Sequence, residues 1–143
     1  MLPSRAAVIN ESTLNLRSPP TSLLRRRTSA TAPTGAKSSR TVSIVLKNGV
    51  EVYGGFNGTE SSLAQRPAFG VAPSILSGDL LNNDSTGAVN DNSYHVLKGT
   101  GTNASAVLDG FTVRGGNSNG SGNNNKGGGI LCISNSSPSI RNC

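Results

Sequence analysis

The chain has 143 residues, of which 34% are hydrophobic and 3% aromatic, with 18 Gly and no Trp. This length suits one domain and is too short for two ordinary ones. The scarcity of large side chains excludes a helical bundle or a globin-like fold, whose cores need bulky apolar residues. No apolar run approaches the ~20 residues that a membrane-spanning helix requires. The composition therefore predicts small and β-branched side chains buried in short elements between many turns.

The formal net charge of +6 is concentrated at one end of the chain. Residues 1–40 contain seven of the 13 Lys and Arg residues and a single acid, whereas residues 41–143 contain six basic and six acidic residues. Surfaces that bind single-stranded nucleic acid interleave basic and aromatic side chains, and residues 1–40 contain no aromatic residue. We therefore attribute the charge to a tail and expect no nucleic-acid partner.

Residues 1–40, the N-terminal segment, contain 12 Ser or Thr and 4 Pro without any hydrophobic periodicity. Such a composition buries too little apolar surface to offset the entropy of ordering, so we expect disorder. Leu23-Leu24 is too short an apolar run for a secretory signal. An organelle transit peptide and a plain basic linker are two possible origins. The third, a mis-started or frame-shifted reading frame, is favoured by the abrupt change of composition near residue 40.

The body of the chain, residues 41–143, is predicted to consist of strands and turns. Residues 41–46 and 50–56 are apolar and β-branched, with Lys47-Asn48-Gly49 between them. Asn-Gly predicts either a hairpin with a type I′ turn or a corner between the strands of a solenoid. A polar loop follows at 57–66, in which Leu63–Arg66 are expected to form a single helical turn before Pro67. Further strands are expected at 74–76, 94–97, 106–114, 130–133 and 139–141.

No helical periodicity persists over three turns of the body, so the fold class is all-β. The 21 residues from Ile75 to Val96 and the 23 from Leu108 to Leu131 indicate strands that return every ~20–25 residues. That spacing, with Asn, Gly and Ser at the corners, predicts an incomplete right-handed, single-stranded parallel β-helix of the pectate-lyase-like kind. The alternative fold is a β-sandwich, whose strands recur every ~8–12 residues.

The body contains, in order, VEVYGGFNGTE at 50–60, ILSGD at 75–79, SYHV at 93–96, LDGFTV at 108–113, GGN at 115–117, GGGI at 127–130 and SSPSIRNC at 136–143. These motifs resemble bacterial β-helix surface proteins, specifically the repeat of the chlamydial-type polymorphic outer-membrane proteins. In that repeat a Gly-Gly-hydrophobic turn precedes a short strand that ends in Asn-Cys. The resemblance covers residues 40–143 and rests on the joint order of the motifs rather than on any one of them.

The resemblance implies an N-terminal fragment of a large secreted or surface-displayed protein, located outside the cell or at the bacterial outer membrane. The N-terminal segment departs from the family, which would supply an earlier coil and a secretion signal there. Because the chain stops where another strand would follow Asn142-Cys143, we expect a truncated frame or gene fragment. An open solenoid end leaves strand edges unpaired, so we also expect marginal stability or self-association.

Four aspartates are the candidates for carbohydrate chemistry: Asp79, Asp84, Asp91 and Asp109. A β-helix enzyme acting on polysaccharides needs clustered carboxylates, which bind Ca²⁺ or act as an acid/base pair. Asp79 and Asp109 lie in Ser-Gly-Asp and Asp-Gly sequences, where a corner role is the simpler interpretation. Asp84 and Asp91 belong to a polar loop in which solvated carboxylates are ordinary, with a weak Ca²⁺ site as the alternative.

The remaining candidates are one histidine and two cysteines. His95 lies between Tyr94 and Val96 in a predicted strand, so we expect a packed or edge residue rather than a general base. Cys132 and Cys143 are expected to be unbridged apolar fillers, although a disulfide is open to a secreted chain. We accordingly assign no catalytic, cofactor-binding or metal-binding residue and expect no cofactor.

The sequence thus predicts a non-enzymatic, secreted or surface-displayed, adhesin-like scaffold. Its expected partners are a cell-surface or extracellular-matrix component or a polysaccharide. A fragment of a carbohydrate-active β-helix enzyme, of the polysaccharide lyase or hydrolase type, is the alternative.

Overall fold

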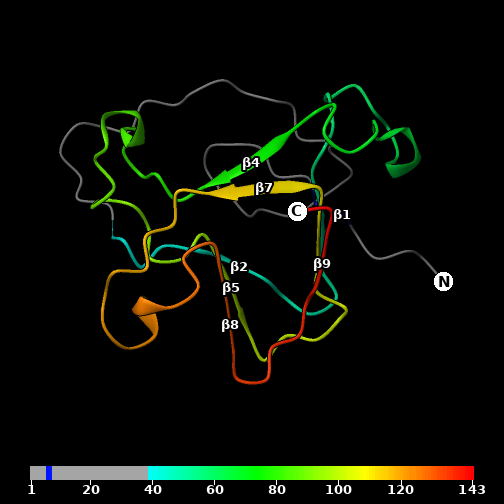
Figure 1. The fold of residues 1–143 in the computed structure, drawn as a ribbon. Coiled ribbons are helices and arrows are strands. Elements are labelled where there is room, and N and C mark those ends of the chain that lie inside the picture. The colour runs from blue at the N-terminus through cyan, green and yellow to red at the C-terminus, as the bar shows by residue number, and fades with distance from the viewer. Residues whose placement is uncertain (1–5, 8–38) are drawn as a thin grey trace.

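A computed structural model describes residues 6–7 and 39–143 (Figure 1). Its regular elements in these ranges are short strands and three one-turn 3₁₀ helices, η1 (Leu63–Gln65), η2 (Asp84–Thr86) and η3 (Gly122–Asn125). The all-β prediction is confirmed for this part of the chain, as is the single turn before Pro67. The strands are β1 (Ala6–Ala7), β2 (Ile44–Val45), β3 (Glu51–Tyr53), β4 (Ser74–Ser77), β5 (Leu97–Thr100), β6 (Val107–Asp109), β7 (Phe111–Arg114), β8 (Ile130–Ile133) and β9 (Ser139–Arg141).

The strands form three separate sheets, with the orders β1-β3-β6-β9, β2-β5-β8 and β4-β7. All of the strand pairs in the described residues are parallel. Figure 1 shows the three sheets on different sides of the body. Hairpins require antiparallel neighbours, so the antiparallel sandwich is excluded. The structure accordingly has long connections between partners rather than tight hairpin turns.

Consecutive strands belong to different sheets, and each sheet gains a strand when the chain returns to it. Ile44 pairs with Leu97 and Leu97 with Ile130, so the two returns take 53 and 33 residues. Val52 and Leu108 are likewise 56 residues apart. The predicted return every 20–25 residues is therefore wrong. The residues from which the spacing of 20–25 was taken lie in or next to strands of different sheets. The loops between strands make each return to the same sheet longer than this spacing.

The segment Lys47-Asn48-Gly49 is a corner and not a hairpin. It joins β2 to β3, which lie in different sheets. The Val50 N–H donates to the Lys47 carbonyl over 3.1 Å, and of the two central residues only Gly49 has a positive φ, of 74°. A type I′ turn needs positive φ at both positions, so the hairpin prediction is wrong.

Several predicted strands differ from the structure at their boundaries; those expected at 41–46 and 50–56 are shorter, as β2 and β3. The expected strand at 106–114 is divided into β6 and β7 by Gly110, whose φ of 84° turns the chain from one sheet into another. The expected strand at 94–97 begins later, at Leu97. Glycine adopts this left-handed conformation without steric cost, and an apolar run that contains one can therefore turn a corner.

Part of the N-terminal segment belongs to the fold. Ala6–Ala7 form β1, which extends the β3 edge in parallel register. Arg40 donates hydrogen bonds to the carbonyls of Asn92 and Asn117, and its guanidinium lies 4.1 Å from the centre of the Tyr94 ring. These contacts join Arg40 to residues of the body. The disorder expected for residues 1–5 and 8–38 lies outside the described residues.

The core is a cluster of aliphatic side chains with one aromatic ring. It draws on all three sheets and contains Leu97 and Leu108, which are 0% and 1% exposed. Small aliphatic residues suffice because each strand contributes only one or two inward positions. The buried members are Leu46, Val52, Leu76, Val96, Leu97, Ala106, Leu108 and Phe111.

Truncation of the core is expected to destabilise the chain more than truncation of an exposed leucine. Leu108→Ala should lower the free energy of unfolding by about 2–5 kcal/mol, because it leaves a cavity between stacked strands. Leu81→Ala is the matched control, since Leu81 is 51% exposed; it should change that free energy by about 0.5 kcal/mol or less. Urea unfolding followed by circular dichroism measures both. Equal losses would show that Leu108 is not a core residue.

Candidate functional site

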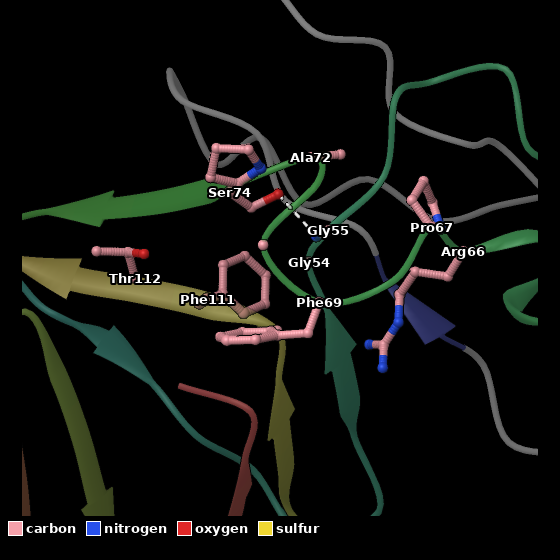
Figure 2. Close-up of a pocket in the computed structure, with 12 residues that line it drawn as sticks. Gly54, Gly55, Arg66, Pro67, Phe69, Ala72, Ser74, Phe111 and Thr112 are labelled. Atoms are coloured by element: carbon pink, nitrogen blue, oxygen red, sulfur yellow. Dashed lines mark hydrogen bonds between the residues drawn. The ribbon is translucent and has the colours of Figure 1, made fainter.

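A small pocket of about 50 Å³ lies where β3 leads out of its sheet and β6 turns into β7 (Figure 2). One wall is the segment at 66–73, which we call the Phe69 loop. The other wall comes from Ser74 of β4 and from Phe111 and Thr112 of β7. Gly54 and Gly110 line it as well, as bare backbone. The pocket thus lies where two sheets and one surface loop meet.

The two glycines bring successive corners of the chain into direct backbone contact. The Gly54 N–H donates to the Asp109 carbonyl over 2.7 Å. A Cβ atom at Gly54 would lie 2.5 Å from the Gly110 carbonyl oxygen, closer than atoms can approach without rearrangement. No side chain therefore fills this side of the pocket, which presents peptide groups.

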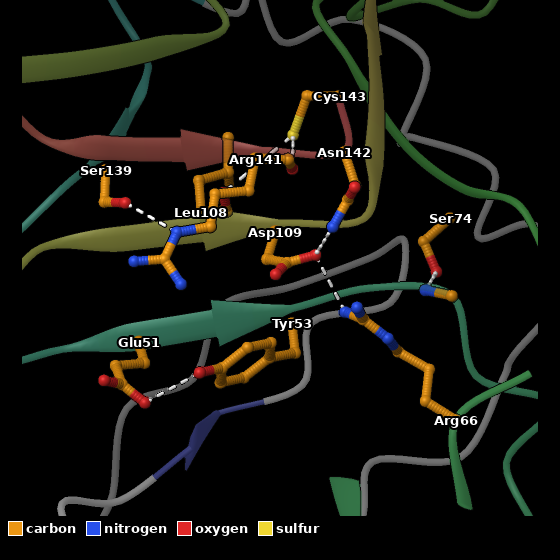
Figure 3. A network of polar contacts seen from close by, with 11 residues as sticks. Glu51, Tyr53, Arg66, Ser74, Leu108, Asp109, Ser139, Arg141, Asn142 and Cys143 are labelled. Atoms are coloured by element: carbon orange, nitrogen blue, oxygen red, sulfur yellow. Dashed lines mark hydrogen bonds and ion pairs between the residues drawn. The ribbon is translucent and has the colours of Figure 1, made fainter. Parts of the chain in front are cut away.

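Arg66 and Asp109 form an ion pair beside the pocket (Figure 3). Arg66 Nη1 lies 2.9 Å from Asp109 Oδ1, and the two side chains are 22% and 9% exposed. The Asn142 amide donates to the same oxygen over 2.9 Å. Asp109 therefore joins the loop before β4 to the residue that follows β9. Its carboxylate has partners on both sides, which agrees with the predicted corner role.

Tyr53 and Glu51 lie below this pair on β3 (Figure 3). The Tyr53 hydroxyl donates to Glu51 Oε2 over 2.9 Å. Burial raises the pKa of the phenol above 10.0, and the Glu51 hydrogen bond and the charges of Glu51 and Asp109 raise it further, against a lowering by Arg141. The Arg66 guanidinium lies 5.8 Å from the Tyr53 ring centre, within cation–π range. Arg66 thus contacts both an acid and an aromatic face.

The loop before Arg66 is organised around the carboxylate of Glu60. Glu60 is 7% exposed and accepts hydrogen bonds from the backbone N–H groups of Asn57, Gly58 and Thr59 over 2.9–3.0 Å. The bond from Asn57 lowers the pKa of Glu60 most, the other backbone N–H groups add to this, and burial opposes it. Gln65 Oε1 accepts from the backbone of Ser61. These bonds fix the path of the chain into Arg66.

The other predicted aspartates hold a different loop together and do not join Asp109. Asp79 accepts hydrogen bonds from the backbone N–H groups of Asn83 and Asp84 over 3.0 and 3.1 Å. Asp84 Oδ1 accepts a hydrogen bond from the side-chain amide of Asn92. Asp91 Oδ2 lies 3.3 Å from the side-chain amide nitrogen of Asn83, in the amide orientation that gives both its oxygen and its nitrogen hydrogen-bond partners. Within residues 6–7 and 39–143, no three His, Cys, Asp or Glu side chains gather around a common point.

Of the two alternatives predicted for His95, a packed or an edge residue, the structure shows the packed one. It is 0% exposed, and its Nδ1 lies 3.1 Å from the Gly127 carbonyl oxygen. Its Nε2 lies 3.3 Å from Asn124 Oδ1. Both ring nitrogens therefore face the loop at 115–129 and support it from below. Among the described residues, the hydrogen-bond partners of the ring are a carbonyl and a side-chain amide, not a nucleophile or a carboxylate.

Cys132 and Cys143 are both exposed and both free, which confirms the unbridged prediction. Cys132 is on β8, whereas Cys143 follows β9 in another sheet. The thiol of Cys143 donates to the Arg141 carbonyl over 3.0 Å. Neither cysteine fills the interior, so the expectation of buried apolar fillers is wrong.

The pocket residues themselves escaped prediction from the sequence. Phe69 is 71% exposed, on a loop whose sequence indicates only an ordinary connection. The one available signal is Phe69, one of 3 Phe residues in the chain, placed between Pro67 and Pro73. Nothing local to Arg66 indicates a partner 43 residues away.

No protein-family model, curated protein or solved structure matches this chain. In the part of the chain that the structure describes, no helix is long and apolar enough to cross a membrane.

The loop before Arg66 is expected to loosen at acid pH. Folding lowers the pKa of Glu60 from 4.5, so the ionised carboxylate stabilises the folded loop fully above pH 4.5. This stabilisation is lost as the pH falls through the pKa of the folded state. The amide resonances of Asn57, Gly58 and Thr59 should shift together between about pH 6 and about pH 2, with a midpoint below 4.5. NMR titration measures this midpoint.

Glu60→Gln should abolish that transition, since the amide does not titrate. Glu51→Gln is the control, because Glu51 is bound to the Tyr53 hydroxyl and not to these amides. If the transition survives in Glu60→Gln, another group organises the loop.

Proposed function

We propose that residues 41–143 belong to a right-handed, single-stranded parallel β-helix that serves as a non-enzymatic, secreted or surface-displayed, adhesin-like scaffold. The single observation behind the proposal is the order in which the chain visits its sheets. β2, β3 and β4 lie in three different sheets, and β5, β6 and β7 then rejoin the same sheets in the same order. β8 and β9 begin a third round. Repeated rounds of parallel strands are the pattern of stacked coils.

The corners repeat with the strands, which supports the same architecture. Asn48 Oδ1 accepts a hydrogen bond from the backbone N–H of Asn103 over 2.8 Å, one round later. The hydroxyls of Thr102 and Ser136 share a hydrogen bond in the following round. Polar side chains that bond to the equivalent turn of a neighbouring coil satisfy backbone groups that no sheet reaches. Right-handed crossovers between parallel strands are by far the commoner hand.

The state of the titratable groups favours a scaffold over an enzyme. Asp109 is held by Arg66 and Asn142, and Asp79 accepts two backbone N–H groups. A general acid or base needs a proton that it can exchange with substrate, and these carboxylates are occupied in fixing loops. The exposed side chains of the Phe69 loop instead offer a contact surface for a cell-surface or matrix partner or a polysaccharide.

The outer strands provide a route to self-association. Among the described residues, β7, β8 and β9 each have a neighbour on one side only. An unpaired strand edge presents backbone N–H and C=O groups to any further strand. We therefore propose that another copy, or a further coil of a longer parent protein, pairs with these edges.

Surface display is testable in intact cells of the organism that encodes the chain. An antiserum against the purified chain should label whole cells, and treatment with proteinase K before lysis should remove the signal. A cytoplasmic protein in the same cells, protected until lysis, is the control. Protection of this chain until lysis would overturn the proposed location.

The enzyme alternative is testable with the same purified chain. We expect no reducing-sugar release from plant or bacterial polysaccharides, with or without added Ca²⁺. Asp109→Ala should lower the free energy of unfolding by about 1–3 kcal/mol, because the partly buried Arg66 loses its counter-charge. Turnover that Asp79→Ala or Asp109→Ala abolishes, with the fold retained by circular dichroism, would establish a carbohydrate-active enzyme instead.

A further inference from the structure

The Phe69 loop holds an aromatic ring out into solvent by its backbone geometry. The Val71 N–H donates to the Ala68 carbonyl over 3.1 Å, and Gly70 between them has a φ of 87°. A turn with positive φ only at its third residue places Phe69 at its tip. Pro67 and Pro73 restrict the chain on either side of the turn. Phe69 is 71% exposed, although burial of a phenylalanine side chain normally stabilises a fold.

The pocket beside this ring is small and polar on one side. Its volume of about 50 Å³ is far below the ~300–1,000 Å³ of sites that enclose a whole small molecule. Only one edge or one substituent of a ligand can enter, and the rest must lie on the surface against Phe69. Peptide groups of Gly54 and Gly110 form part of the lining.

Hydrogen-bonding groups of two side chains are available at the pocket. Ser74 Oγ accepts from the Gly55 N–H over 2.9 Å and retains its hydroxyl hydrogen for donation (Figure 2). Arg66 Nη1 donates to Asp109, whereas its Nε and Nη2 make no hydrogen bond to another described residue. The Asp109 carboxylate neutralises Arg66, so the site has donors but little net charge.

From this combination we propose that the Phe69 loop and its pocket bind a neutral hexopyranose unit of a polysaccharide. A pyranose has an apolar C–H face that packs on an aromatic ring, and a rim of hydroxyls that accept and donate hydrogen bonds. One hydroxyl or hydroxymethyl group enters the pocket beside Ser74, and the sugar face lies on Phe69. This inference rests on the proposed scaffold function and names the partner of its exposed loop.

The proposal distinguishes neutral from acidic sugars. A uronate would need an unpaired cation, and the guanidinium beside the pocket is already paired with Asp109. A protein partner is the competing occupant, because an exposed phenylalanine also suits a protein interface. The two occupants differ in what removal of the ring changes: sugar affinity in one case, oligomeric state or protein binding in the other.

Titration of the full, ¹⁵N-labelled chain with sugars tests the proposal. Methyl β-D-glucopyranoside and cellotriose are the neutral probes, and a galacturonate trimer is the anionic probe. We expect saturable shifts in residues 66–74 and 110–112 with the neutral probes and weaker binding of the galacturonate. Phe69→Ala should weaken binding of the neutral probes at least tenfold, and Phe69→Trp should preserve it.

Val71→Ala is the matched control, because Val71 is equally exposed on the same loop and does not line the pocket. It should leave the affinity unchanged. The amide spectrum of each variant reports whether it is folded, and Phe69→Trp keeps the test valid if Phe69→Ala does not fold.

Three results would overturn the proposal: no saturable shift with the neutral probes, unchanged affinity in Phe69→Ala, or preference for galacturonate. A dimer that Phe69→Ala dissociates, without sugar binding, would assign the loop to a protein interface. A surface-exposed chain that binds no sugar would refute this inference alone, whereas a sugar-binding chain found only inside cells would refute the proposed location.

Discussion

Every strand that the structure describes depends on a partner from a different round of the chain. The pairs join residues that are 32 to 56 positions apart, as in Leu108 with Ile140 and Val52 with Leu108. Strands of two to four residues have no stability of their own. The sheets, the core and the corners must therefore form together. Ordering one round without its neighbour would cost chain entropy without burying the inward side chains.

The candidate site lies where strands from different rounds of the chain pair in parallel. Where two corners meet, Gly54 and Gly110 approach so closely that neither tolerates a Cβ atom. The same contact leaves a hollow with peptide groups on one side. The adjoining loop supplies Arg66, which pairs with Asp109 on the neighbouring round. One set of contacts thus holds the rounds together and shapes the pocket.

Loop residues perform two separable tasks in this molecule. Glu60 and Asp79 hold their loops by accepting backbone N–H groups, so their charges are used internally. His95 supports another loop from the buried side. Phe69 instead lies largely exposed at the tip of a backbone turn. Glu60, Asp79 and His95 explain how a chain with 3% aromatic residues keeps long loops in place. Phe69 instead marks the exposed surface that is available to a ligand.

The sequence by itself determined the class of local structure and most strand positions, because β-branched runs, Gly and Asn act over a few neighbours. It indicated a packed or edge position for His95 and the turn at Leu63–Gln65 for the same reason. Only the tertiary structure decided which strands pair, since parallel pairing over 32 to 56 residues has no local signal. It alone separated the run at 106–114 into two sheets and joined Arg66 to Asp109. Phe69 stands out only once its neighbours are in place, because exposure depends on what the rest of the chain covers.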